Sequence, residues 1–94
     1  MYGTVMIARV KSDVQAISDA GRKWVAERGA AVGYVDQWVM KADDGRMVMA
    51  VRFESKDAYL KLADDPTQDE WYRAVLEPHL DGAPEWIDGE WQTL

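Results

Sequence analysis

The sequence predicts an α+β domain of the ferredoxin-like class, with the order β-α-β-β-α-β and two helices on one face of an antiparallel four-stranded sheet. Three observations lead to this class. Strand-like runs occur at residues 2–11, 33–41, 47–54 and 85–93, segments with helical spacing lie between them, and a hairpin turn joins the middle pair. The length of 94 residues allows one domain, residues 1–94.

The first strand leads directly into the first helix. Residues 2–11 form an apolar run with β-branched side chains, which is typical of a strand buried on both faces. The following SDVQ (residues 12–15) matches a capping box, with Ser12 as the expected N-cap. Apolar residues then recur at helical spacing as far as Val25, which indicates an amphipathic helix. Gly29 is expected to end this helix in the left-handed conformation.

The two middle strands are joined by the turn sequence DDGR, in which glycine accepts a positive φ without a Cβ clash. The returning strand, MVMAVRFE, follows at once. With a two-residue loop at 44–45, Trp38 is expected opposite Val51, and Met40 opposite Met49. That register places all four side chains on one face of the sheet.

A second helix is expected directly after Ser55, which can cap it, as far as the interruption at DDP (residues 64–66). The TQDE segment (residues 67–70) matches another capping box, so the helix is expected to restart there. Pro78 lacks an N–H group and clashes with the preceding turn, which places the helix end near Glu77.

The last strand is expected at residues 85–93, EWIDGEWQT. Gly89 in its middle predicts a β-bulge. A bulge there would bring Trp86 and Trp91 to the same face, although they are five residues apart.

The sheet is expected to carry apolar side chains on both faces, whereas the two helices cover only one. In the first strand Met6, Ala8 and Val10 oppose Val5 and Ile7, and in the third strand Met49, Val51 and Phe53 oppose Val48 and Ala50. The pattern leaves open which set faces the helices. An exposed apolar face marks an interface, so we expect a homodimer joined sheet to sheet. The alternative is a monomer with an apolar open face.

Composition excludes several classes of function. The net charge of −6 argues against a nucleic-acid partner, because phosphate binding needs an excess of Lys and Arg. The absence of Cys excludes disulfides and thiolate metal sites. No signal peptide is visible, and no run approaches the ~18 apolar residues of a membrane span, so a cytoplasmic protein without membrane contact is expected. Arg9 and Arg52, both within strands, are expected to pair with Asp36 or Asp88, or to bind a ligand carboxylate.

Three further segments carry a family resemblance: FESKDAY (residues 53–59), DDPTQDEWYR (residues 64–73) and PEWIDGEW (residues 84–91). With the strand order, they make the whole chain resemble the dimeric α/β-barrel superfamily, and within it the small antibiotic biosynthesis monooxygenase-like proteins. The resemblance implies a homodimer with a small-molecule pocket between helices and sheet. It also implies monooxygenation of a small aromatic compound without a cofactor. The alternative is a non-catalytic ligand-binding or structural dimer.

Other members of that superfamily hold heme, using an Asn on the first strand with a Trp and a His on the second helix. By register these positions fall at Met6, Leu62 and Trp71 in this sequence. Met6 cannot hydrogen-bond a bound oxygen species, and Trp71 cannot ligate iron. The resemblance therefore implies neither heme degradation nor any cofactor, and no metal site is expected. The acidic pairs at 43–44 and 64–65 lack the ligand pattern of a Ca²⁺ loop.

The pocket implied by the resemblance has six candidate ligand-binding side chains: Trp71, Tyr72, Tyr59, Trp38, Leu62 and Met6. Trp71 and Tyr72 lie on the apolar side of the restarted helix, which also predicts that they pack on the sheet. The catalytic residues are unknown, with His79 and Tyr72 as candidates. Because His79 follows the expected helix end, its imidazolium can instead meet the negative end of the helix dipole.

Overall fold

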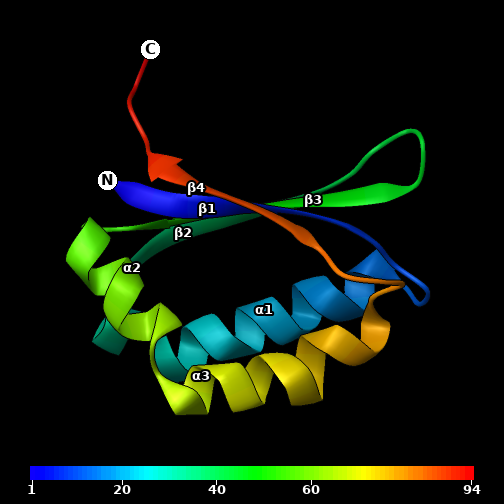
Figure 1. Cartoon of the computed structure of the whole chain (residues 1–94), viewed down its shortest axis with the longest axis horizontal. Coiled ribbons are helices and arrows are strands. Elements are labelled where there is room, and N and C mark those ends of the chain that lie inside the picture. The colour runs from blue at the N-terminus through cyan, green and yellow to red at the C-terminus, as the bar shows by residue number, and fades with distance from the viewer.

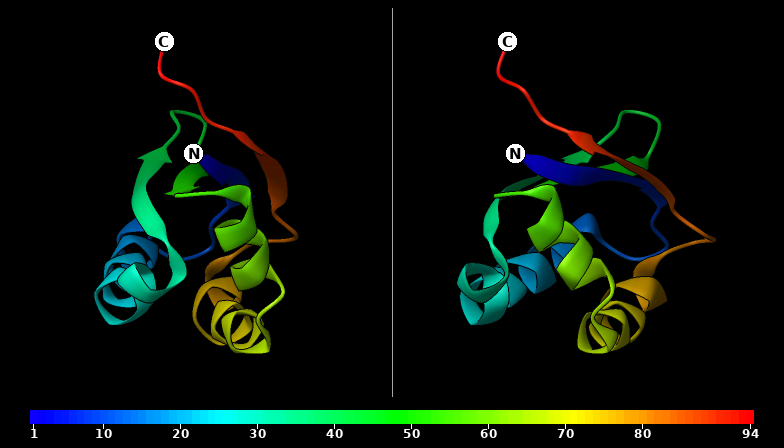
Figure 2. Two further views of the ribbon diagram at one scale, coloured as in Figure 1. Left: turned by 90° about the vertical axis from the view of Figure 1, so that its left-hand side faces the viewer. Right: turned by 60° about the vertical axis from the view of Figure 1, so that its left-hand side comes forward.

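The computed structural model describes all residues, 1–94, and has the ferredoxin-like order (Figure 1). The elements are β1 (Tyr2–Arg9), α1 (Val14–Arg28), β2 (Tyr34–Lys41), β3 (Arg46–Phe53), α2 (Lys56–Ala63), α3 (Pro66–Trp71) and β4 (Glu85–Glu90). The strands form one antiparallel sheet in the order β2-β3-β1-β4. All three helices lie on one side of it, and the other side is bare (Figure 2). The predicted fold class is confirmed.

Helix α1 ends before Gly29 as predicted, but its N-cap residue and the conformation of Gly29 differ from the prediction. The N-cap is Asp13, whose Oδ1 accepts a hydrogen bond from the Gln15 backbone N–H at 2.9 Å, so the prediction of Ser12 was wrong. At the other end Gly29 is right-handed, with φ −54, and begins a 3₁₀ turn. A Cβ on Gly29 would lie 3.3 Å from the Tyr34 ring, so packing explains this glycine. The left-handed residue is Gly33, with φ 76.

The second helical region is capped twice, as the interruption in its sequence predicts. Ser55 caps α2, accepting from the Ala58 N–H at 3.1 Å. The cap of α3 is Asp65 and not Thr67, because Pro66 with its fixed φ takes the first helical position. Beyond α3 the chain continues as a π-helical turn and a 3₁₀ turn. Helical conformation therefore ends at His79, two residues later than predicted.

The β2–β3 hairpin has a three-residue loop, residues 43–45, closed by a 2.7 Å hydrogen bond from the Ala42 N–H to the Arg46 carbonyl. Gly45 takes the left-handed conformation there, with φ 90. The predicted two-residue loop was wrong. One extra loop residue shifts the pairing by one, and a shift of one sends each side chain of β2 to the other face of the sheet.

The observed register pairs Trp38 with Ala50 and Met40 with Val48. Both β2 side chains therefore lie on the open face, where Trp38 is 54% and Met40 56% exposed. On the other face of the sheet, the side chains that meet the helices are buried: Met6, Ala8, Met47, Val51 and Phe53. They form the core together with Ile17, Trp24, Leu62, Leu76 and Leu80. This assignment settles which of the two alternating sets meets the helices.

The open face also carries an ion pair between neighbouring strands. Arg52 donates to both oxygens of Asp36, with distances of 2.8 Å and 2.6 Å, so the predicted pairing with Asp36 is confirmed. This hydrogen bonding lowers the pKa of the Asp36 carboxyl. The Arg52 guanidinium carbon also lies 5.2 Å from the centre of the Trp38 ring, in a cation–π contact. Arg52 on β3 thus contacts two side chains of the neighbouring strand β2 on this face, Asp36 and Trp38.

Strand β4 pairs with β1 without a bulge, from the Tyr2–Glu90 pair to the Ile7–Glu85 pair. The bulge predicted at Gly89 is absent. Trp86 therefore faces the helices, and Trp91 lies beyond the strand with its indole nitrogen next to Gly3, on the other face. No helix of the chain is long and apolar enough to cross a membrane.

Candidate functional site

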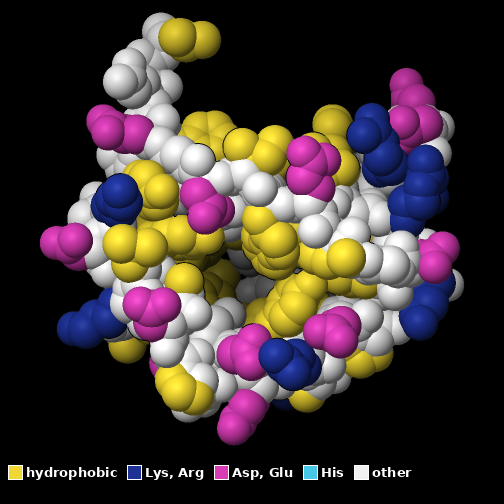
Figure 3. Space-filling view, viewed as in Figure 1, with side chains coloured by type: hydrophobic (Ala, Val, Ile, Leu, Met, Phe, Trp, Pro, Cys, Tyr) yellow, Lys and Arg dark blue, Asp and Glu magenta, His cyan; other side chains and the backbone are white.

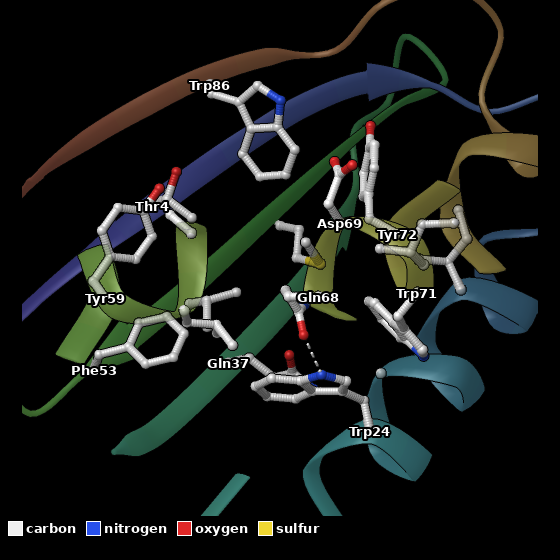
Figure 4. Close-up of a pocket in the computed structure, with 17 residues that line it drawn as sticks. Thr4, Trp24, Gln37, Phe53, Tyr59, Gln68, Asp69, Trp71, Tyr72 and Trp86 are labelled. Atoms are coloured by element: carbon white, nitrogen blue, oxygen red, sulfur yellow. Dashed lines mark hydrogen bonds between the residues drawn. The ribbon is translucent and has the colours of Figure 1, made fainter. Parts of the chain in front are cut away.

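A cavity of about 350 Å³ lies between the helix-facing side of the sheet and helices α1, α2 and α3. Its size falls within the ~300–1,000 Å³ range of small-molecule sites. Figure 3 shows its mouth as a hollow rimmed by hydrophobic side chains, in the same view in which Figure 1 places β4 above and α3 below. The lining side chains come from every layer of the fold (Figure 4).

Six aromatic side chains line the cavity: Trp24, Phe53, Tyr59, Trp71, Tyr72 and Trp86. They form contacting pairs: the Trp24 and Trp71 rings have centroids 6.1 Å apart, and those of Tyr72 and Trp86 are 5.9 Å apart. None of these pairs is coplanar, so flat ring faces and edges alternate around the space. Such a wall favours a flat, apolar guest.

A few polar side chains interrupt this wall. Thr4 donates from Oγ1 to the Ile87 carbonyl at 3.3 Å, which leaves its methyl group for packing. Gln37 reaches in from β2 and Gln68 from the first turn of α3. Asp69 is the one charged lining residue, and its Oδ2 lies 3.1 Å from Arg73 Nε. The cavity thus offers amides and a single carboxylate.

The two phenols of the lining are held in their neutral forms. Burial first, and then the hydrogen bond to Asp88, raises the pKa of Tyr59 to about 12. Its hydroxyl donates to Asp88 Oδ1 at 2.9 Å and is therefore already engaged. Burial, followed by the nearby Glu77 charge, also raises the pKa of Tyr72. Neither phenol is a phenolate near neutral pH.

A pH titration tests the Tyr59 environment. The folded-state pKa lies above the ordinary tyrosine value of 10.0, so the neutral phenol stabilises the fold fully below pH 10, and this contribution is lost as the pH rises through 12. Phenolate absorbance should show one late-titrating tyrosine near pH 12 that Tyr59→Phe removes. Melting temperatures should fall less steeply for Tyr59→Phe than for the wild type over this window. Disappearance of a phenol titrating near 10 would contradict the assignment.

Of the six ligand-binding candidates from the sequence, Tyr59, Leu62, Trp71 and Tyr72 lie on the cavity lining. Met6 is fully buried in the adjoining core, beneath the lining. Trp38 lies on the opposite face of the sheet, because of the one-residue difference in hairpin register. The lining therefore excludes Trp38 and Met6.

The catalytic candidate His79 lies outside the cavity lining. Its Nδ1 is 2.6 Å from Ser12 Oγ, in a hydrogen bond, and its carbonyl accepts from the Lys11 N–H at 2.9 Å. These contacts tie the segment after α3 to the segment before α1. The other catalytic candidate, Tyr72, is on the lining. No group of three or more His, Asp or Glu side chains is arranged to hold a metal ion.

Most of the lining residues were absent from the sequence-based candidates, among them Trp24, Gln68 and Trp86. Trp24 lies in α1, among the apolar residues whose spacing predicted that helix, and nothing in the sequence distinguishes a core Trp from one that also borders a cavity. The position of Trp86 at the cavity depends on how β4 pairs with β1, and in that pairing Trp86 lies opposite Met6. Gln68 Oε1 accepts a hydrogen bond from Trp24, 44 positions away in the sequence, and no local pattern reveals such a contact.

No protein-family model matches the chain, and no curated protein matches its sequence. Among solved structures it is similar to SnoaB, a cofactor-independent oxygenase from Streptomyces nogalater, with TM-score 0.74 and 14% identity, covering 99% of this chain and 94% of that one. It is also similar to the ActVA-Orf6 monooxygenase of Streptomyces coelicolor in complex with nanaomycin D, with TM-score 0.72 and 20% identity, covering 99% and 88%. A conserved protein from Methanosarcina mazei Go1 has TM-score 0.74 and 16% identity, covering 97% and 92%.

The fold therefore defines a class: this chain is built like the dimeric α/β-barrel proteins. Within that class it matches antibiotic biosynthesis monooxygenase structures, at low sequence identity and over nearly its whole length. The resemblance inferred from the sequence is confirmed at the level of fold.

Proposed function

We propose that this protein binds a small aromatic molecule in the cavity between sheet and helices, and that it oxygenates this molecule without a cofactor. The observation that carries the proposal is the aromatic lining, which offers ring faces and edges around a mainly apolar cavity. The similarity in fold to SnoaB, a cofactor-independent oxygenase, supports the same conclusion.

The reaction class needs little from the protein beyond binding and proton transfer. An aromatic compound with an acidic methylene group loses a proton, and the resulting electron-rich carbanion reduces O₂. The balance is R₂CH₂ + O₂ → R₂C=O + H₂O, with the substrate as the source of all electrons. On the lining, Asp69 and Tyr72 can exchange protons, and they are neighbours on one helical face.

A second candidate function is ligand binding without catalysis. It is favoured by the state of the lining phenols, because both have a raised pKa and Tyr59 already donates to Asp88. It is favoured also by the position of His79, which leaves the cavity without an imidazole. Both functions share the same binding site.

We also propose a homodimer, formed by the open faces of two sheets. Trp38, Met40 and Ile87 are more than half exposed on that face, and Val5, Ile7 and Ala50 lie between them. Covering an apolar side chain of this size stabilises a complex by about 1.5–3 kcal/mol. The open face of a second copy carries the same apolar side chains, so it can bury those of the first.

Replacing Trp71 with Phe tests the cavity as a binding site. Trp71 borders the cavity and also packs against the buried core, and Phe keeps most of that packing. We expect a several-fold weaker affinity for naphthol, with a melting temperature close to that of the wild type. The binding measurement is a titration followed by the indole N–H resonances of the five Trp.

The matched control is Trp38→Phe, on the open face of the sheet, which should leave the naphthol affinity unchanged. Equal effects of the two substitutions would refute the proposed binding site. Catalysis is then tested with anthrone, whose methylene group is acidified by two rings and a carbonyl. Oxygen uptake with incorporation of one labelled atom from O₂ supports oxygenation, and binding without uptake supports the non-catalytic function.

A further inference from the structure

The amide of Gln68 is held in one orientation. Its Oε1 accepts from Trp24 Nε1 at 2.9 Å, a contact drawn as a dashed line in Figure 4, and from Arg28 Nη1 at 3.4 Å. Indole and guanidinium groups are donors only, so the atom that meets them must be the amide oxygen. These two donors therefore also fix the position of the Gln68 amide nitrogen, because the flipped amide would place its NH₂ group against them.

The groups that orient Gln68 are themselves tied down. Arg28 Nη2 donates to Asp65 Oδ2 at 3.1 Å, and Asp65 is the N-cap of α3, with its Oδ1 accepting from the Thr67 N–H at 2.9 Å. The Gln68 backbone N–H in turn donates to the Asp65 carbonyl at 3.1 Å. The end of α1 and the start of α3 therefore hold this side chain from both sides.

The amide nitrogen of Gln68 is left with two N–H donors and no acceptor within the chain. Every fully buried side-chain nitrogen or oxygen has a partner, so this unpaired nitrogen is at least partly exposed, and Gln68 is one of the residues that line the cavity. Gln37, the other lining amide, lacks any fixing contact of this kind. Gln68 thus brings a preoriented, unpaired donor to the lining of a cavity that six aromatic side chains share.

We propose that Gln68 Nε2 is the specificity-determining donor of this cavity, selecting aromatic ligands that carry an acceptor oxygen such as a carbonyl or a phenolate. The inference rests on the proposed binding function and adds the feature that the ligand must present. A ligand with such an oxygen satisfies the donor, whereas a pure hydrocarbon of the same shape displaces water from it without replacement. The role is one of positioning, since the amide transfers no proton.

The test compares indanone with indane, which differ by one carbonyl group. We expect the wild type to bind indanone about tenfold more tightly, the magnitude of one well-formed hydrogen bond. The chain has four Gln and no Asn, so each side-chain amide signal can be followed separately by nitrogen-15 NMR. Indanone should shift the Gln68 amide signal, and indane should leave it nearly in place.

The decisive variant is Gln68→Glu, because its oxygens still accept from Trp24 and Arg28 while the donor is gone. Preference for indanone should disappear in this variant and persist in the control Gln15→Glu, on the exposed face of α1. Equal affinity of the wild type for both probes, or a shift confined to the Gln37 amide, overturns the inference. If naphthol still binds, the proposed function survives that result; if naphthol also fails to bind, both proposals fall.

Discussion

Trp24→Ala is expected to lower the free energy of unfolding by about 3–5 kcal/mol, the range for removing a large buried aromatic side chain. Trp24 is only 6% exposed and packs between Tyr34 and Trp71, with ring centroids 6.0 Å and 6.1 Å away. Its loss enlarges the existing cavity and removes the stronger of the two donors to Gln68. The free energy is measured by urea denaturation.

The control is Trp24→Phe, which keeps an aromatic ring in place but loses the indole donor. Arg28 still donates to Gln68 Oε1, so the oxygen is not left without a partner. We expect a loss of about 1–2 kcal/mol, from one hydrogen bond and a smaller ring. If the alanine variant were no less stable than the phenylalanine variant, Trp24 would not be the packing centre described above.

Ala50→Glu is expected to convert the proposed homodimer into a monomer. Ala50 lies in the middle of the open face, between Val5 on one neighbouring strand and Trp38 on the other. A glutamate there would place an unpaired carboxylate inside the sheet-to-sheet contact, and burying such a charge is costly unless it is paired. Light scattering at micromolar concentration should give twice the chain mass for the wild type and the chain mass for the variant.

Ala74→Glu adds the same charge at an exposed position of the helical layer, far from the open face. It should leave the dimer mass unchanged. A wild-type protein that is monomeric at this concentration would remove the shared-interface proposal. If the Ala50→Glu variant stayed dimeric, the dimer interface would have to lie on another surface of the protein.

The order and type of the secondary structure elements could be predicted from the sequence, because they depend on local chemistry. Alternating and helical spacings of apolar residues specify strands and helices over a few residues, and Ser55 and Gly45 act within their own turns. The errors at helix ends were also local. Asp13 competes with Ser12, and Asp65 with Thr67 two residues later, for the cap of the same helix, and a pattern alone does not rank them.

The sequence also showed that both faces of the sheet are apolar, since alternation makes both sets visible. Which set faces the helices was decided by packing, which buries Met6, Val51 and Phe53 under the helical layer. The face on which each β2 side chain lies depended on the β2–β3 register, and that register depended on one residue of loop length. Trp38 was placed at the ligand site and lies instead on the open face for this reason alone. Because side chains along a strand alternate between two faces, a register error of one residue places every side chain of that strand on the wrong face of the sheet.

The cavity itself was decided only by tertiary structure. Four of its lining residues were among the candidates because the resemblance placed a pocket beside the second helical region. The contact between Trp24 and Gln68 joins α1 to α3, and the position of Trp86 comes from the pairing of β4 with β1. Local spacing carries no information about such long-range contacts. The sequence by itself thus determined the layers of this protein, and the packing of those layers determined its site.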